Sequence, residues 1–139
     1  MVPISREWEQ YSMDNFQIKT LKLPDDILVV APIGALDSVT TTELEKNIQK
    51  FVESKICNFI FDLTKLENVT SAGIGFFTKL TGIATEHHGG IVIINPNASV
   101  KETMDIFGLF RYIPLADNLD SALRIISQKK TGQTRRPNL

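Results

Sequence analysis

A serine with the surroundings of a phosphorylation site stands at the start of a predicted helix. Ser71 follows a buried strand that ends near Leu63 and a short connection, and it directly precedes Ala72 and Gly73. A serine at such a place is most often an N-cap, whose hydroxyl accepts a backbone N–H. The same place also suits phosphorylation, because the first helical turn offers unpaired N–H groups and the positive end of the helix dipole. A phosphate would add about −1.5 to −2 charges and repel a partner packed on the adjoining small apolar surface.

No other group of side chains has the spacing that catalysis or metal binding requires. His87 and His88 are adjacent on a predicted helix, so their side chains point about 100° apart and do not ligate one metal together. Neither histidine is expected near Cys57, which argues against a Cys–His nucleophilic pair. The glycines of 73–75 lack the rest of a dinucleotide or P-loop fingerprint, and close helix packing explains them more simply. We therefore expect a non-catalytic protein with no cofactor and no metal.

Strands alternate with helices around this serine. Residues 16–23 and 27–33 predict a hairpin, and the almost wholly apolar run 56–63 predicts a central strand covered on both faces. The further expected elements are a helix from Thr40 to about Ser54 opened by a Thr40–Glu43 capping box, a helix over 73–87, a strand over 91–94, a helix over 99–107 opened by a Ser99–Glu102 capping box, an edge strand over 111–115 and a last helix that begins at Asn118 to Asp120 and runs through Ile126. This order predicts a single α/β domain, with a mixed sheet opened by an N-terminal hairpin and about four helices packed on it.

The length of 139 residues fits one such domain. Residues 1–15 are polar and show no sustained period, so we expect an N-terminal arm that is partly ordered against the domain. The domain itself is expected over 16–127. Residues 128–139 carry basic side chains and no apolar period, which predicts a basic, flexible tail.

The charge balance gives no support for binding to nucleic acid or to an anionic membrane. Lysine and arginine number 15 against 16 aspartate and glutamate residues, for a formal charge of −1. The tail 128–139 contains four of these basic residues and no acidic one. The rest of the chain therefore has 11 basic and 16 acidic residues, a formal charge of −5, which suits a protein partner with a basic face.

The sequence also predicts a cytoplasmic protein without membrane insertion. The single cysteine, Cys57, cannot form an intrachain disulfide, and the first residues have no apolar stretch typical of a secretion signal. The longest apolar stretch, near 27–36, is interrupted by Pro32 and Gly34, and it is far shorter than the roughly 20 residues of a spanning helix.

Four segments, in order, resemble the motifs of the STAS family, the anti-sigma factor antagonists of bacterial partner-switching systems. Residues 34–37 (Gly-Ala-Leu-Asp) are similar to the family's Gly-x-Leu-Asp turn, and 62–64 (Asp-Leu-Thr) to its Asp-Leu-Ser strand end. Residues 70–75 (Thr-Ser-Ala-Gly-Ile-Gly) resemble its Asp-Ser-Ser/Thr-Gly-Leu-Gly segment, and 108–113 its late Gly-Leu-Phe segment. The resemblance covers roughly 16–128 and implies a mixed sheet with helices on it, in agreement with the residue patterns.

The resemblance also implies a mechanism. The unmodified domain binds an anti-sigma factor that is a serine kinase and so releases a sigma factor; phosphorylation of the serine matched by Ser71 ends the binding, and a serine phosphatase of the PP2C type restores it. On this hypothesis Ser71 is the phosphoacceptor. The expected contact surface around it consists of Asp37, Thr70, Ala72, Gly73 and Ile74. Asp37 has a purely structural alternative, which is to help start the helix that follows it.

Two departures from the family pattern motivate an alternative function. Thr70 stands where many phosphorylated members have Asp, and Ala72 replaces a second hydroxyl residue. A threonine at this place also occurs in relatives that serve as scaffolds or as subunits associated with transporters. The alternative is therefore a constitutive STAS subunit, or scaffold, of a larger signalling or lipid-transport complex.

Overall fold

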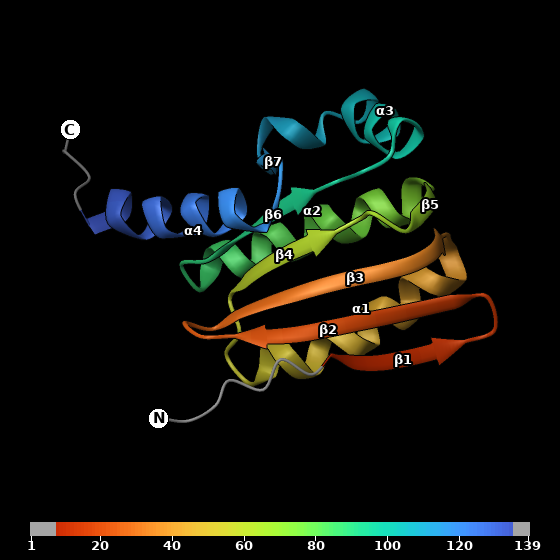
Figure 1. Ribbon diagram of the computed structural model, residues 1–139, viewed down its shortest axis with the longest axis horizontal. Helices are drawn as coiled ribbons and strands as arrows, with labels where there is room; N and C mark the ends of the chain where they lie inside the picture. The colour runs from red at the N-terminus through yellow and green to blue at the C-terminus, as the bar shows by residue number, and fades with distance from the viewer. Residues whose placement is uncertain (1–7, 135–139) are drawn as a thin grey trace.

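A mixed sheet of seven strands carries four α-helices within the described part of the chain (Figure 1). The computed structural model describes the backbone of residues 8–134 and the side chains of residues 8–128. In chain order the elements are β1 (Glu9–Met13), β2 (Phe16–Leu23), β3 (Ile27–Leu36), α1 (Ser38–Glu53), β4 (Asn58–Asp62), β5 (Leu66–Val69), α2 (Ser71–Glu86), β6 (Gly90–Ile94), α3 (Ala98–Ile106), a 3₁₀ turn (Leu109–Arg111), β7 (Leu115–Ala116) and α4 (Leu119–Thr134). The predicted α/β class with an opening hairpin is confirmed.

The long strand β3 organises the sheet. The strand order is β1-β2-β3-β4-β6-β7, in which β1, β2 and β3 are antiparallel and the pairs from β3 onward are parallel. The first half of β3 pairs with β4 up to Val30, and from Gly34 its last residues pair in parallel with β5. The register with β5 shifts between Gly34 and Ala35, and only glycine fits at Gly34, since its φ is +116° and a Cβ would lie 2.6 Å from the carbonyl oxygen of Asn15.

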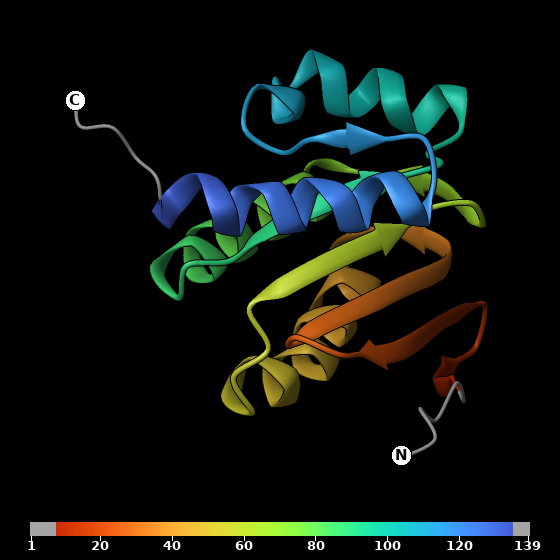
Figure 2. The same cartoon turned by 60° about the vertical axis from the view of Figure 1, so that its left-hand side comes forward.

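Helices cover both faces of the sheet (Figures 1 and 2), and each face has its own core. Helices α1 and α2 cover one face, where Phe59 and Phe61 of β4 pack, while Ile60 between them points to the other face and packs in the core under α4. This alternation confirms that the run 56–63 contains a central strand buried on both sides, although the strand itself is limited to Asn58–Asp62. The rings of Phe61 and Phe77 meet edge to face, with centroids 4.9 Å apart.

The expected N-terminal arm over 1–15 contains a strand. Residues Glu9–Met13 form β1, the edge strand paired with β2, and the Tyr11 hydroxyl donates a 2.8 Å hydrogen bond to Glu43 of α1. The side chains of β1 are exposed or half-buried, so backbone pairing orders this strand without leaving an apolar period in the sequence. Residues 1–7 of the expected arm lie outside the described residues.

The expected tail over 128–139 begins inside a helix. The backbone of helix α4 continues past the core residue Ile126 to Thr134. Residues 135–139 of this tail lie outside the described residues. Of the helices in the described part of the chain, none has the length and apolar character needed to cross a membrane.

Two helices are capped earlier than their sequence patterns predict, α1 by three residues and α3 by two. The expected capping boxes at Thr40–Glu43 and Ser99–Glu102 are wrong, because Asp37 caps α1 and Asn97 caps α3. Asp and Asn are themselves preferred N-cap residues, and Asp37 and Asn97 have the extended backbone angles of that position. By contrast, the predicted start of the last helix is confirmed, since the side-chain oxygen of Asn118 accepts the N–H of Ser121 at 2.8 Å.

Two further segments differ from their predictions. Of the expected edge strand 111–115, only Leu115 lies in a strand, the two-residue β7, whereas Arg111 ends the 3₁₀ turn Leu109–Arg111 and residues 112–114 are irregular. The expected connection between the central strand and the second helix contains the short strand β5, of which only the end residues Leu66 and Val69 are buried. Four residues are too few to show a period, and β5 is recognisable only from its pairing with β3.

Candidate functional site

Two loops meet at the carboxyl ends of β3 and β5. These strands are parallel with Leu36 opposite Val69, so the β3–α1 loop and the β5–α2 loop leave the sheet at the same edge. The backbone N–H of Thr70 donates to the carbonyl oxygen of Leu36 at 2.9 Å, and the Thr70 hydroxyl donates to the same oxygen at 3.1 Å. The pairing therefore holds the loop that carries Asp37 beside the loop that carries Ser71.

Asp37 is an exposed carboxylate that fixes the start of α1. Its Oδ1 accepts the N–H groups of Val39 and Thr40, both at 2.9 Å, and the Thr40 hydroxyl accepts the N–H of Asp37 at 2.9 Å. The hydrogen bonds that the carboxylate accepts, led by that of the Thr40 N–H, lower the pKa of Asp37 below 3.8. The structural role proposed for Asp37 is thus confirmed, and its side chain also places a negative charge at the site.

Ser71 is the first residue of α2 and not its N-cap. Thr70 occupies the N-cap position with extended backbone angles, so the expectation that Ser71 caps the helix is wrong. The Thr70 side chain makes no capping hydrogen bond, and its hydroxyl donates to the Leu36 carbonyl oxygen. The first turn of α2 therefore lacks a side-chain acceptor, whereas α1 and α3 each have one. The Ser71 side chain is exposed and makes no hydrogen bond with any described residue.

The contact surface expected around Ser71 is only partly exposed. Thr70 and Asp37 are exposed and Ala72 is half-buried, but Gly73 and Ile74 are buried, and Ile74 keeps only 6% of its surface accessible. Gly73 and Ile74 therefore offer little surface to a partner, because the helix turns by about 100° per residue and directs them to the sheet.

The Gly73 position is tightly packed. A Cβ on this glycine would lie 2.6 Å from Cγ2 of Val69 and 3.1 Å from Cβ of Leu36. Such distances are shorter than ordinary van der Waals contact, so a residue with a side chain would force the neighbours apart. The packing interpretation of this glycine is confirmed, and the absence of its side chain lets α2 lie close to the ends of β3 and β5.

The sequence interpretation missed the exposed parts of this surface. Val39, on the first turn of α1, is 61% exposed and supplies the apolar side chain that Ile74 does not. Ser71, Gly75, Thr78 and Gly82 are all exposed and follow one another at helical spacing, so they form a flat outer face of α2. The three- and four-residue intervals of these small residues are the signal that could have identified this face.

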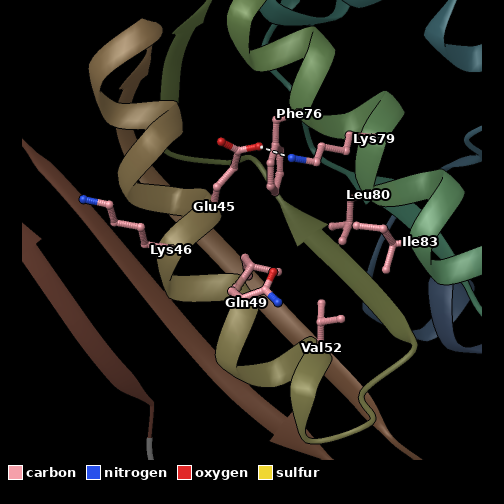
Figure 3. Close-up of a pocket in the computed structure, with 9 residues that line it drawn as sticks. Glu45, Lys46, Gln49, Val52, Phe76, Lys79, Leu80 and Ile83 are labelled. Atoms are coloured by element: carbon pink, nitrogen blue, oxygen red, sulfur yellow. Dashed lines mark hydrogen bonds and ion pairs between the residues drawn. The ribbon is translucent and has the colours of Figure 1, made fainter.

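A groove runs between α1 and α2 and separates this outer face from α1 (Figure 3). Its volume is about 250 Å³, and its apolar wall includes Phe76 and Leu80. Figure 3 shows Glu45 of α1 facing Lys79 of α2, and their charged atoms lie 3.5 Å apart. Both side chains are exposed, so this ion pair contributes at most about 1 kcal/mol. The sequence pattern did not predict the groove, because the way in which α1 and α2 pack beside each other depends on the tertiary structure.

The remaining candidates for chemistry do not form a site within the described residues. His87 ends α2, with its Nδ1 2.9 Å from the carbonyl oxygen of Ile83, and His88 follows with a positive φ of 66°. No group of three or more potential metal ligands occurs among the described residues. The two-loop junction is therefore the site that the sequence and the fold bring together.

Comparison with known proteins places this geometry in a family context. Residues 19–122, well over half of the chain, match the family model of the STAS domain. An anti-sigma F factor antagonist from Paenibacillus polymyxa is 24% identical over 98 residues, which cover 70% of this chain and 84% of the relative.

Two solved structures have a similar fold. The anti-sigma factor antagonist SpoIIAA in its unphosphorylated form has a TM-score of 0.66 at 15% identity, and the match covers 88% of this chain and 99% of that one. The Bacillus cell fate determinant SpoIIAA in its phosphorylated form has a TM-score of 0.62 at 16% identity, over 78% of this chain and 98% of that one. At these identities the structural likeness concerns the fold.

Proposed function

The chain belongs to the STAS domain family, and we propose that it is an anti-sigma factor antagonist whose binding to its partner is switched by phosphorylation of Ser71. The partner is an anti-sigma factor with serine kinase activity, and its capture by the unphosphorylated protein releases a sigma factor. The observation that carries this proposal is the exposed Ser71 hydroxyl on the first turn of a helix that has no side-chain cap.

The position of Ser71 suits a phosphoacceptor on two counts. The hydroxyl is exposed and makes no hydrogen bond with a described residue, so a kinase can reach it without breaking a structural contact. The N–H groups at the start of α2 have no side-chain acceptor, so they and the helix dipole stabilise a phosphate at this place. The protein therefore accepts the modification without losing its fold.

The effect of the phosphate is electrostatic. Thr70 holds the Ser71 loop against Leu36, the residue that precedes the ionised Asp37. A phosphate adds about −1.5 to −2 charges to a surface that already contains this carboxylate, on a body whose formal charge is −5. The flat outer face of α2 and the exposed Val39 form the contact surface in the unmodified state, and like charges repel the partner from it afterwards.

The cycle of phosphorylation and dephosphorylation needs a phosphatase in the same compartment as the protein and its kinase. A serine phosphatase of the PP2C type hydrolyses the phosphoserine and restores the binding-competent protein. The protein itself works in the cytoplasm and carries out no catalysis. The relative SpoIIAA has been solved in unphosphorylated and phosphorylated forms, which supports a switch of this kind in a similar fold.

The test uses the candidate kinase with magnesium and ATP, followed by mass spectrometry of the intact protein and its peptides. We expect the γ-phosphoryl group of ATP to be transferred to the Ser71 oxygen, with ADP as product and no mass gain in the Ser71→Ala variant. Ser38 is a matched control, since it is also an exposed first residue of a helix, but its helix is capped by Asp37. The Ser38→Ala variant is expected to be modified like the wild type.

Two outcomes would overturn the switch. One is the absence of a phosphoryl group on Ser71 in the presence of an active kinase that modifies another substrate. The other is stable co-purification with subunits of a larger signalling or transport assembly that the Ser71→Asp variant leaves unchanged. The second outcome would favour the constitutive STAS subunit, in which Thr70 and Ser71 have only structural roles.

A further inference from the structure

On one face of the sheet, the part formed by the N-terminal strands is not covered by a described helix. Figure 1 shows α1 behind β2 and β3, and no described helix in front of them. Helix α4 packs on this front face over β4 and β6, where Ile60 and Val92 lie, and the core beneath it extends to Ile27 and Val29 at the start of β3. A hollow of about 350 Å³ lies on the uncovered part, within the size range of small-molecule sites.

The strand register explains what lines the hollow. Gln10 of β1 pairs with Lys19 of β2, and Lys19 pairs with Ala31 of β3, so these three side chains form one row across the sheet. Ile33 of β3 lies two residues further along the same face. Ala31 and Ile33 are half-buried and form an apolar floor, and Trp8 lines the hollow with 44% of its surface exposed.

The charges around the hollow are unbalanced. Lys19 and Lys65 line it, and neither forms an ion pair with a described residue. The one carboxylate in the lining, that of Asp62, already accepts the Thr64 hydroxyl at 2.6 Å and the Thr64 N–H at 3.2 Å. The lining therefore has two positive groups and one negative group, on a body whose formal charge is −5.

We propose that this hollow binds a small planar aromatic anion, such as an aryl phosphate or aryl carboxylate. The ring of the ligand stacks on the Trp8 indole over Ala31 and Ile33, and its anionic group lies between the ammonium groups of Lys19 and Lys65. Stacking needs a flat partner with a π face, and the two lysines need a negative charge, so the lining requires both properties in one molecule. The site is separate from Ser71 and does not depend on the proposed switch.

The probe for this proposal is 2-naphthyl phosphate, compared with 2-naphthol and with inorganic phosphate. Trp8 is the only tryptophan of the chain, so its indole N–H gives a single, assignable NMR signal at the site. We expect 2-naphthyl phosphate to shift this signal together with the backbone amides of Lys19, Ile33 and Lys65. The two partial probes, which lack either the charge or the ring, are expected to bind at least about tenfold more weakly.

Variants distinguish this site from general attraction to the protein. Lys19→Gln with Lys65→Gln, and separately Trp8→Ala, are expected to weaken binding of 2-naphthyl phosphate by about tenfold or more. The control is Lys22→Gln, which removes a lysine of the same strand whose side chain points to the opposite face of the sheet. This control is expected to bind like the wild type.

Three results would overturn the proposal. Equal binding of inorganic phosphate would indicate an adventitious ion only. Equal weakening by Lys22→Gln would indicate an effect of net charge. The absence of shifts at the site in the wild type, with shifts appearing only after removal of residues 1–7, would indicate that the chain's own first residues occupy the hollow.

Discussion

Thr70 and Leu36 are joined by two hydrogen bonds to one oxygen. The Thr70 N–H and the Thr70 hydroxyl both donate to the Leu36 carbonyl, at 2.9 and 3.1 Å. A carbonyl oxygen has two lone pairs and can accept both. This contact binds the start of α2 to the end of β3 and so keeps Asp37 and Ser71 on one surface.

The Thr70 hydroxyl is expected to stabilise the fold measurably. Thr70→Val keeps the shape of the side chain and removes the donor, so we expect a loss of about 1 kcal/mol in the free energy of unfolding. Thr70→Ser keeps the hydroxyl and is expected to stay closer to the wild type. Chemical denaturation of the three proteins measures the difference, and equal stabilities of the wild type and the valine variant would refute the role.

Substitution by alanine is expected to change the free energy of unfolding in opposite directions at Gly73 and at Gly75. Gly73→Ala brings a methyl group within 2.6 Å of Val69, which is expected to cost about 1–3 kcal/mol. The added methyl of Gly75→Ala meets no atom within 4 Å, and alanine has the higher helix propensity, so we expect a gain of about 0.5–1 kcal/mol. Chemical denaturation curves measure both differences. A Gly73→Ala protein as stable as the wild type would contradict the prediction, because it would show that Val69 moves away from the new methyl group at no cost in stability.

Asp37 is expected to make stability depend on pH in the acid range. Its pKa is lower in the folded protein than the ordinary value of 3.8, so its ionised form stabilises the fold at higher pH, and this contribution is lost as the pH falls through the folded pKa. Asn also caps helices but does not ionise. The stability of the wild type relative to Asp37→Asn should therefore be constant near neutral pH and decrease below about 3.8. A difference that stays constant down to about pH 2 would contradict this assignment.

Tyr11 is expected to hold β1 in place. Its hydroxyl donates to Glu43, and this hydrogen bond is the main cause that raises the pKa of Tyr11. We expect Tyr11→Phe to speed hydrogen exchange of the β1 amides about three- to tenfold and to leave those of β4 unchanged. The control is Tyr112→Phe, which removes a hydroxyl 2.7 Å from that of Thr78 and far from this strand in the fold. Unchanged exchange in β1 would show that strand pairing alone orders it.

The fold was largely predictable from hydrophobic pattern, and the exceptions have physical causes. The run 56–63 and the apolar periods of helices α1 and α2 reflect burial, which the sequence records directly. Strands β1 and β5 are held by backbone pairing to a partner far along the chain, so their side chains carry little signal. The caps were misplaced because several polar residues near each helix start can accept an N–H, and only the backbone angles decide which one does.

The position of the site was predictable from the sequence, but the set of residues exposed on its surface was not. The segment around Ser71 and the loop at Asp37 were both identified from the sequence, and the pairing of β3 with β5 brings them together. Which neighbours face a partner depends on the rotation of α2 against the sheet. That rotation buries Gly73 and Ile74 and exposes Gly75 and Thr78. Val39 was missed because an apolar residue in a first helical turn gives no sign of its exposure.

The central claim is that a phosphate on Ser71 prevents partner binding, and the most direct test is the dissociation constant of the partner for the two forms. Isothermal titration calorimetry would compare the unmodified protein with protein phosphorylated on Ser71, and the Ser71→Ala and Ser71→Asp variants beside them. We expect the Ala variant to bind like the unmodified protein, and the phosphorylated form to bind about a hundredfold more weakly or worse, since like charges at an interface cost several kcal/mol. Equal affinities of the phosphorylated and unmodified forms would contradict the account.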